Sequence, residues 1–407
     1  MPSAKPLPPQ PDFLRRETRR LLEFSVAAAI PGGGFGVLDT AGRLPTDAPI
    51  DGVLTCRKIH SYALATALGE FDGAHLVGHG LKALRGPLRD DKHGGWYKND
   101  TGEDRRKEAY LHAFVALAAS TAVGFGYDAR DLLDEAIAVI ERRFWSEDEG
   151  AMRERFEADW TGEMDYRGAN ANMHSVEAFL ALADVTGDTE WLGRAERIVE
   201  RLIHDHARSN GHAVIEHFDR TWNVLRTFNA ERPYDDLRPY GLTPGHYAEW
   251  SHLLLRLQMA LEEAGRASPS TLRDDAEGLF AATLRDGWKD EPPGIVYTVG
   301  WDGEASVENR PHWVIAEAAV AAEFLSGRTG GEGYAEWRNR FWATIEDVFV
   351  DEAFAGWWNE VDGRNQPSEA IYRGKPDLYH AYQAVLAARL PLAPTYAAAV
   401  RRSLDST

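Results

Sequence analysis

The sequence predicts an all-α fold and, within that class, an (α/α)6 barrel, which is a closed ring of six helix hairpins. Two observations lead to this prediction. A histidine stands near the start of an apolar, alanine-rich segment six times along the chain, and each interval leaves room for a polar loop and one more helix. Repeated helix pairs are typical of toroids and solenoids. The six marker histidines are His60, His112, His174, His246, His312 and His380.

The first residues differ in composition from the rest of the chain. Residues 1–12 are rich in proline and predict a flexible arm, whereas residues 13–407 are expected to form one catalytic domain. Residues 15–29 have the apolar spacing of an amphipathic helix. The glycine-rich turn at residues 31–36 lacks the Lys-Ser/Thr pair of a phosphate-binding loop, so it predicts no nucleotide site.

Each repeat is expected to pair an apolar inner helix with a charged outer one. The apolar helices are predicted to open near Arg57, Tyr110, Asn172, His246, His312 and Tyr379. Amphipathic segments at 130–144, 190–206, 270–284 and 333–349 supply outer helices. The inner helices would run parallel, so their N-terminal ends would meet at one mouth of the barrel.

Composition and charge exclude several functions. The chain has 407 residues, and its formal net charge of -19 argues against nucleic acid and anionic membranes as partners. Its one cysteine, Cys56, excludes an intrachain disulfide. No apolar run is long enough to span a bilayer, and the N-terminal residues lack the apolar segment of a secretory signal, so a cytoplasmic protein is expected. The oligomeric state is not predicted.

The segment Thr243–Trp250 carries the clearest chemical signal. Pro244 and Gly245 precede an apolar helical run, which places His246 and Glu249 in the first helical turn and on one face. A carboxylate one turn from an imidazole can orient the ring and raise its pKa. The simpler alternative is an ordinary helix start with a first-turn acid.

The predicted mouth would gather a set of polar and aromatic side chains, and three kinds of chemistry compete for it. Histidine side chains, whose pKa lies near neutral pH, are suited to proton transfer on a sugar, and an arginine can stabilise an enediolate oxygen. His246, Glu249 and His380 could instead form a 2-His-1-carboxylate metal site, although no HExxH motif is present. Glycoside hydrolysis would need two carboxylates, for which Glu249, Glu317 and Asp377 are available. Loops rich in Trp and Tyr suit stacking on a sugar ring.

Five stretches together resemble the N-acylglucosamine 2-epimerase superfamily. They are Cys56–His60, Asn170–His174, Thr243–Trp250, His312–Glu317 and Lys375–His380, in that order over nearly the whole chain. The His312-Trp313 pair is more similar to the aldose–ketose isomerase branch, which includes mannose and sulfoquinovose isomerases, because the 2-epimerases tend to have a Trp-Trp pair there. Relatives often carry a tryptophan where this chain has Val53, and this departure bears on substrate preference.

The resemblance implies an (α/α)6 barrel and a reaction without metal or cofactor. It implies that His380 moves a proton between C2 and C1, that His246, held by Glu249, assists ring opening, and that Arg57 binds the C1 and C2 oxygens. The residues implied to line the sugar site are Tyr110, Asn170, His174, His312 and Trp313.

The expected reaction converts D-mannose to D-fructose through a cis-enediolate, with a monosaccharide as the only partner expected. A sulfoquinovose isomerase, with Arg238 or Arg373 near C6, and a sugar 2-epimerase remain alternatives. A non-catalytic sugar-binding protein would not need the full set of histidines.

Overall fold

The computed structural model describes residues 7–406, in which helices predominate and all strands are short. Residues 1–6 of the predicted arm lie outside this range, and the first helix begins at Pro11, earlier than predicted. The described chain forms two compact units. Unit 1 contains the residues up to Phe24, Leu202–Glu216 and Arg226–Pro394, and unit 2 contains Ser25–Arg201, His217–Leu225 and the residues from Thr395 onward. The single domain expected over residues 13–407 stays a prediction.

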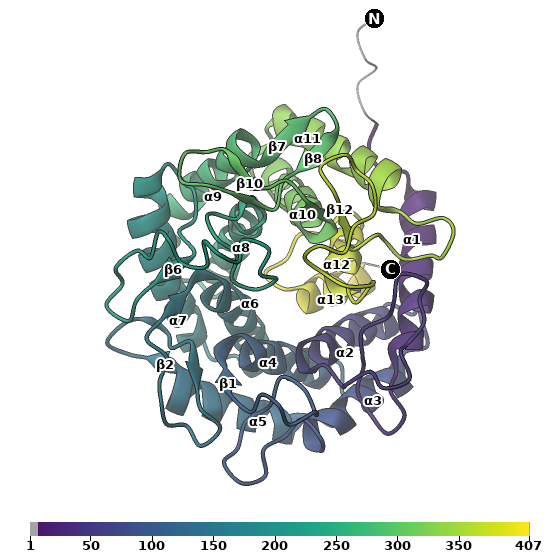
Figure 1. The fold of residues 1–407 in the computed structure, drawn as a ribbon, viewed down its shortest axis with the longest axis vertical. Helices are drawn as coiled ribbons and strands as arrows, with labels where there is room; N and C mark the ends of the chain where they lie inside the picture. The colour runs from purple at the N-terminus through teal and green to yellow at the C-terminus, as the bar shows by residue number, and fades with distance from the viewer. Residues whose placement is uncertain (1–6, 407) are drawn as a thin grey trace, which may run out of the picture. The chain divides into compact units, whose positions relative to one another are not determined.

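Along the chain, helices that are almost entirely buried alternate with helices that are buried on one side. Figure 1 labels both kinds. The apolar helices are α2 (Gly52–Ala67), α4 (Ala109–Gly124), α6 (Ala169–Thr186), α8 (Pro244–Glu263), α10 (His312–Thr329) and α12 (Tyr379–Ala387). The others are α1 (Pro11–Ser25), α3 (Ala74–Arg85), α5 (Arg130–Val139), α7 (Glu190–Val199), α9 (Thr271–Ala282), α11 (Glu332–Thr344) and α13 (Tyr396–Asp405). Nearly every residue of α4 is buried, whereas α5 buries only Leu132, Leu133 and Ala136.

Four charged helices end in a π-helical turn, at Ile140–Phe144, Glu200–Ala207, Thr283–Gly287 and Ile345–Phe349. These turns account for the predicted helix ends near residues 144, 206, 284 and 349. Single π-helical turns are frequent at functional sites. Short 3-10 turns occur at Val26–Ala28 and Arg208–Asn210.

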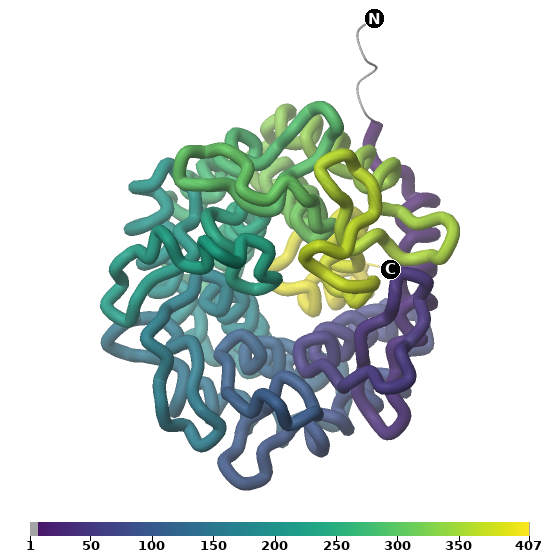
Figure 2. Tube along the Cα trace, viewed as in Figure 1, coloured from purple at the N-terminus to yellow at the C-terminus, as the bar shows by residue number. Residues whose placement is uncertain are grey.

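The strands form only two-stranded antiparallel pairs. They pair β1 (Lys107–Glu108) with β4 (Arg155–Phe156), β2 (Trp145–Ser146) with β3 (Ala151–Met152), β5 (Arg167–Gly168) with β6 (His217–Phe218), β7 (Trp288–Asp290) with β8 (Pro293–Ile295), β9 (Thr298–Val299) with β10 (Ala305–Val307), and β11 (Arg310–Pro311) with β12 (Glu360–Val361). Several of these strands lead directly into an apolar helix: β1 precedes α4, β5 precedes α6 and β11 precedes α10. The trace in Figure 2 shows the long loop (yellow-green) that joins α11 to α12.

In each unit, the contacts between one pair of neighbouring apolar helices show that the pair runs in the same direction, as predicted. In unit 2, Arg57 of α2 contacts Tyr110 of α4, and His60 further along α2 contacts Thr121 further along α4. In unit 1, His252 of α8 contacts Glu317 of α10, and Arg256 one turn later lies over Phe324. Contacts that advance in the same direction on both helices require parallel axes. Among the described residues, no helix is both long and apolar enough to cross a membrane.

Candidate active site

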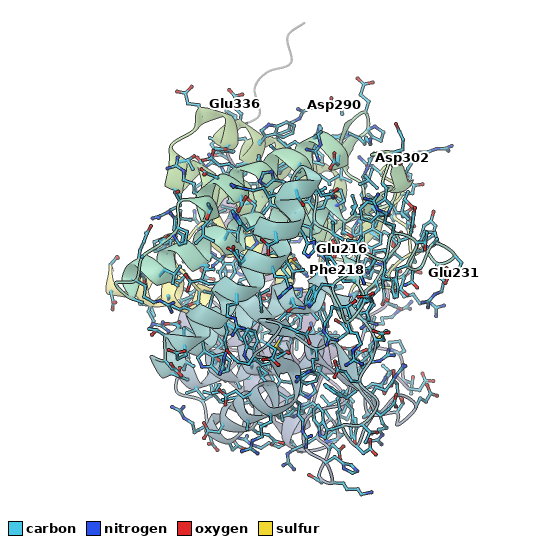
Figure 3. The ribbon with its side chains drawn as sticks, turned by 90° about the vertical axis from the view of Figure 1, so that its left-hand side faces the viewer. Glu216, Phe218, Glu231, Asp290, Asp302 and Glu336 are labelled. Atoms are coloured by element: carbon cyan, nitrogen blue, oxygen red, sulfur yellow. The ribbon has the colours of Figure 1, made fainter. Side chains whose placement is uncertain are left out.

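The start of α8 places His246 against a buried carboxylate. Pro244 occupies the first turn, where its missing N–H costs nothing, and His246 follows two residues later. The Nδ1 atom of His246 lies 2.9 Å from Oε1 of Glu216. Glu216 is 3% exposed, and Figure 3 shows it inside unit 1, whereas the labelled Glu231 of the same unit is exposed. A carboxylate can only accept here, so Nδ1 carries the proton and Nε2 keeps its lone pair.

This partner differs from the predicted one. Glu249 was expected to hold His246, but the residue that contacts Nδ1 is Glu216, from a loop thirty residues before His246. The i, i+3 spacing does place Glu249 one turn along α8, where its side chain is buried. Glu249 therefore keeps its predicted place near His246 without holding Nδ1.

His380, near the start of α12, is held by a second buried carboxylate. Its Nδ1 lies 2.9 Å from Oε1 of Glu317 on α10. The other oxygen of Glu317 lies 2.6 Å from Nε2 of His252 on α8. Burial alone would raise the pKa of the Glu317 carboxyl, but hydrogen bonds from His252 and His380 outweigh it and hold that pKa well below its usual range. Glu317 is therefore a fixed negative charge that orients the ring of His380.

His312 supports the helix that carries His380. Its Nδ1 lies 3.1 Å from the carbonyl oxygen of Asn359, and its Nε2 lies 2.8 Å from Oδ2 of Asp377. The same Asp377 oxygen accepts the backbone N–H of His380 at 3.1 Å, as a helix cap does. Both ring nitrogens of His312 thus face protein acceptors, so this residue supports the start of α12. Its contact with the sugar stays a prediction.

The indole of Trp313 lies beside both of these histidines. Its ring centroid is 5.3 Å from that of His246 and 5.9 Å from that of His380, and the planes are tilted by only 32° and 39°. Its Nε1 donates to the hydroxyl of Tyr372 at 3.2 Å, which anchors the ring. The ring is partly exposed. Trp313 thus lies between the two imidazoles and contacts both with its apolar ring. Its role in sugar binding stays a prediction.

In unit 2, three of the predicted sugar-binding residues form one cluster with Phe114. Arg57 donates to the hydroxyl of Tyr110 at 3.0 Å, and its guanidinium lies 4.5 Å above the ring of Phe114. The His174 ring packs against both aromatic rings, 5.1 Å from Tyr110 and 4.7 Å from Phe114. Its Nδ1 lies 3.4 Å from the Glu177 carboxylate. The cluster combines a fixed cation, a phenol and an imidazole, which are suitable donors for sugar hydroxyls. Sequence reasoning did not identify Phe114, because it follows the apolar pattern of its helix.

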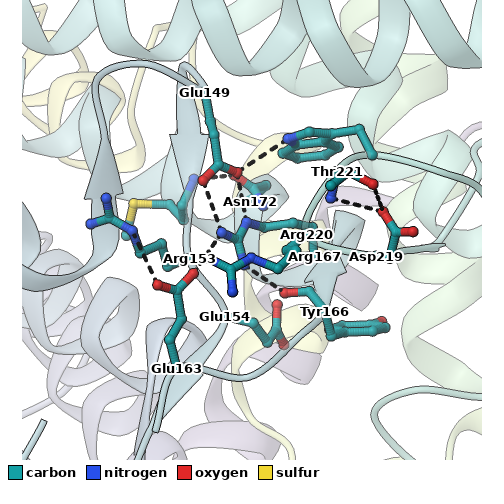
Figure 4. A network of polar contacts seen from close by, with 12 residues as sticks. Glu149, Arg153, Glu154, Glu163, Tyr166, Arg167, Asn172, Asp219, Arg220 and Thr221 are labelled. Atoms are coloured by element: carbon teal, nitrogen blue, oxygen red, sulfur yellow. Dashed lines mark hydrogen bonds and ion pairs between the residues drawn. The ribbon is translucent and has the colours of Figure 1, made fainter. Parts of the chain in front are cut away.

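A buried polar network holds the N-terminal end of α6, which carries Asn170 and His174 (Figure 4). Arg167 is 1% exposed and contacts Glu149 through two nitrogens, at 2.7 and 2.8 Å, and Glu163 at 2.7 Å. Burial alone would lower the pKa of Arg167, but the two carboxylates raise it. Since β5 ends one residue before α6, this ionic cluster fixes the direction in which the helix starts.

The two asparagines at this end of α6 differ in their surroundings. Asn172 is fully buried and bonds within the protein, to the Gly168 carbonyl and the Met152 amide. Asn170 is partly exposed. Of the two alternatives that the sequence left open, only Asn170 is accessible to a ligand, and its role in sugar binding stays a prediction.

Two of the marker histidines are parts of the core. His60 lies in the third turn of α2, because Asp51 caps that helix at Gly52, and its Nδ1 bonds to Thr121 at 2.7 Å. His112 bonds to the Glu108 carbonyl and accepts the Trp96 amide. Burial lowers the pKa of His112 to about 3, so the ring is neutral. His60 and His112 therefore do not belong to the set of marker histidines available for chemistry.

No metal-binding group was found in the described part of the chain. Within residues 7–406, no three or more His, Cys, Asp or Glu side chains are arranged so that they could hold an ion. His246, Glu249 and His380, which the sequence offered as a 2-His-1-carboxylate site, do not form such a group.

His246 and His380 each contact a buried carboxylate, and both lie beside the indole ring of Trp313. This arrangement defines a class of helical-repeat proteins equipped for proton transfer. The model of the N-acylglucosamine 2-epimerase family matches residues 33–384. The chain belongs to this family, as the sequence resemblance indicated.

Individual relatives cover almost the whole chain. A protein from Pseudomonas cannabina pv. alisalensis named D-mannose isomerase is 51% identical, over 97% of this chain and 96% of its own length. A D-mannose isomerase from Thermobifida fusca is 44% identical, over 95% of this chain and 96% of its own length.

Solved structures agree on the fold. A crystal structure of D-mannose isomerase has a TM-score of 0.87 at 26% identity and covers 95% of this chain and 99% of its own. The cellobiose 2-epimerase from Spirochaeta thermophila has a TM-score of 0.77 at 20% identity, covers 97% of this chain and 99% of its own, and is similar in fold alone. These are (α/α)6-barrel enzymes, and the predicted fold class is confirmed.

Proposed function

We propose that this protein is an aldose–ketose isomerase that interconverts D-mannose and D-fructose. The observation that carries the proposal is the His380–Glu317 pair, in which the 2.9 Å contact at Nδ1 leaves Nε2 of His380 as an unprotonated base. The two relatives named D-mannose isomerase, at 51% and 44% identity, support mannose as the aldose. A cytoplasmic location and a monosaccharide as the only partner belong to the same proposal.

The first step is opening of the sugar ring, which needs one acid and one base. His246, with Nδ1 held by Glu216, presents Nε2 for this proton exchange. Ring opening moves a proton from the hydroxyl at C1 to the ring oxygen and yields the free aldehyde.

The second step is proton transfer between carbons. Nε2 of His380 removes the proton from C2, the electrons move to the carbonyl oxygen at C1, and a cis-enediolate forms. The same nitrogen returns the proton to C1. The proton of the C2 hydroxyl passes to the C1 oxygen, so that the C2 oxygen becomes the ketone and C1 becomes a CH₂OH group. Glu317 stabilises the imidazolium that exists between these transfers, as a buried carboxylate beside a histidine does.

The remaining sugar-binding assignments follow the family resemblance. Arg57 is proposed to bind the C1 and C2 oxygens, where negative charge develops, and its contact with Tyr110 keeps the guanidinium in a fixed direction. Tyr110, Asn170 and His174 are proposed to bind hydroxyls, and the partly exposed ring of Trp313 is proposed to stack on the sugar.

A 2-epimerase is the second candidate, and one observation favours it. His246 and His380 lie on the same tryptophan, and each has its own carboxylate. Two independent bases are what epimerisation at C2 requires. For glycoside hydrolysis, Glu317 could not serve as the general acid, because two histidines hold it as an anion.

A proton NMR time course with D-mannose and a chelator in the buffer tests the proposal. Fructose that appears before any glucose supports the isomerase. Glucose that appears first would identify a 2-epimerase. Activity that is lost to the chelator and restored by a divalent ion would contradict the cofactor-independent mechanism.

A further inference from the structure

The hydrogen bonds behind His380 continue past Glu317 into the core of unit 1. His252 contacts Glu317 through Nε2 at 2.6 Å, and its Nδ1 receives the Nε–H of Arg256 at 3.4 Å. His252 and Arg256 are each 4% exposed and lie one turn apart on α8. The guanidinium of Arg256 also lies 4.3 Å from the ring of Phe324.

In this series of hydrogen bonds from Arg256 to His380, the donor and acceptor of each bond follow from the groups present. The Nε–H of an arginine can only donate, so Nδ1 of His252 must accept. A neutral His252 then carries its proton on Nε2 and donates it to Glu317. With that oxygen occupied, the other oxygen of Glu317 accepts from Nδ1–H of His380, and Nε2 of His380 is left as the base.

The charges along the chain also balance. Glu317 is negative and Arg256 is positive, with the neutral ring of His252 between them. A buried carboxylate without a nearby cation would favour a second proton on His252, which would weaken its support of His380. The cation of Arg256 opposes that protonation.

We infer that Arg256 and His252 are positioning residues that fix the tautomer of His380 through Glu317. The inference rests on the proposed function, because it assigns the orientation of the proposed base. Neither residue needs to touch the sugar, so their substitution is expected to lower kcat and leave KM within about twofold. Changes in residues that orient a functional histidine from behind typically cost about 10- to 100-fold.

The kinetic test compares substitutions that keep or remove the donor. His252→Gln retains an amide N–H for Glu317 and is expected to keep most of the activity, whereas His252→Leu removes the donor and should lower kcat about 10- to 100-fold. Arg256→Gln keeps a donor without the charge, and Arg256→Met removes both. If His252→Leu and Arg256→Met fold and retain wild-type kcat, the inference is wrong.

A spectroscopic test separates positioning from a merely structural effect. The two-bond ¹⁵N–¹H spectrum of histidine-labelled wild-type protein is expected to show His252 as the Nε2–H tautomer and His380 as the Nδ1–H tautomer at pH 8. His252→Asn and His380→Asn variants assign the two signals. Arg256→Met should change the His252 signal. A wild-type His252 signal of the Nδ1–H tautomer or of the imidazolium would overturn the inference.

The same spectra distinguish its failure from that of the proposed function. The tautomers are measured without substrate, so they test the hydrogen-bond chain even if the sugar is not mannose. Correct tautomers with no turnover of D-mannose would leave the positioning intact and contradict the proposed substrate.

Discussion

Replacing Gly245 by alanine should disturb the site without removing a functional group. Gly245 lies in the first turn of α8, next to His246, and is buried. A Cβ atom added there would lie 2.5 Å from Cζ3 and 2.7 Å from Cη2 of Trp313, and 3.0 Å from Cγ2 of Val314. Because carbon atoms pack comfortably at about 3.5–4.0 Å, the indole must retreat by roughly 1 Å.

The size of the effect follows from what the indole contacts. Forcing an extra methyl group into a packed interior costs about 1–3 kcal/mol of stability. The retreat also moves the plane that spaces His246 from His380, and a misplacement of about 1 Å near reacting groups can lower turnover by about 100-fold. We therefore expect Gly245→Ala to lower the melting temperature and to lower kcat/KM more than its stability loss alone would suggest.

Gly78→Ala is the matched control. Gly78 lies within α3, and nothing lies within 4 Å of the position its Cβ would take. Alanine there should stabilise the helix by about 0.5–1 kcal/mol and leave kcat/KM unchanged. The assays are thermal unfolding followed by circular dichroism and initial rates of fructose formation. Wild-type stability and wild-type kcat/KM in Gly245→Ala would refute the placement of Trp313 against this turn.

Three further predictions concern histidines and their partners. His380→Ala should lower the rate of fructose formation at least 100-fold with the circular dichroism spectrum unchanged, since general base catalysis contributes about 10²–10⁴; a folded variant with near-normal turnover would exclude His380 as the base. Glu216→Gln removes a charge-assisted bond of about 1.5–3 kcal/mol, so kcat at pH 8 should fall about 10- to 100-fold, and an unchanged kcat would show that Glu216 does not support His246. The pKa of His112 is lowered to about 3, chiefly by burial, so below its ordinary pKa of about 6.5 the unfolded chain binds a proton that the folded chain refuses. As the pH is lowered from 6.5 to 3, the free energy of unfolding should therefore fall by up to about 1.4 kcal/mol per pH unit. Urea unfolding of a folded His112→Asn variant should show a weaker dependence of this free energy on pH. The same pH dependence in the variant and the wild-type protein would contradict the reasoning.

The regular part of the fold could be predicted because it depends on local patterns. The alternation of apolar and charged helices follows from spacing alone, and the segments at 130–144 and 190–206 appear as α5 and α7, each with its π turn. The start of α2 was misplaced because Asp51, six residues before the expected start at Arg57, caps the helix through its side chain. A capping carboxylate followed by glycine is a weak signal when the sequence has many such pairs.

The site was harder to predict because its partners are distant in the sequence. The spacing of His246 and Glu249 suggested a local pair, but the acceptor for Nδ1 is Glu216, for which no periodicity gives a signal. Glu317 was noted only as an available carboxylate, since its contact with His380 depends on how α10 packs against α12. His60 follows the marker pattern but lies in the core. This could not be predicted, because the spacing of residues in the sequence does not show which side chains are buried.

Deuterium incorporation tests the central claim most directly. In the proposed mechanism a protein base carries the proton from C2 to C1, and the proton on this base exchanges with solvent. D-mannose converted by the wild-type protein in D₂O should therefore give fructose that carries deuterium at C1, measured by NMR at low conversion. Fructose that retains all of the C2 hydrogen at C1, with no deuterium from solvent, would indicate hydride transfer and contradict the role of His380 as the base.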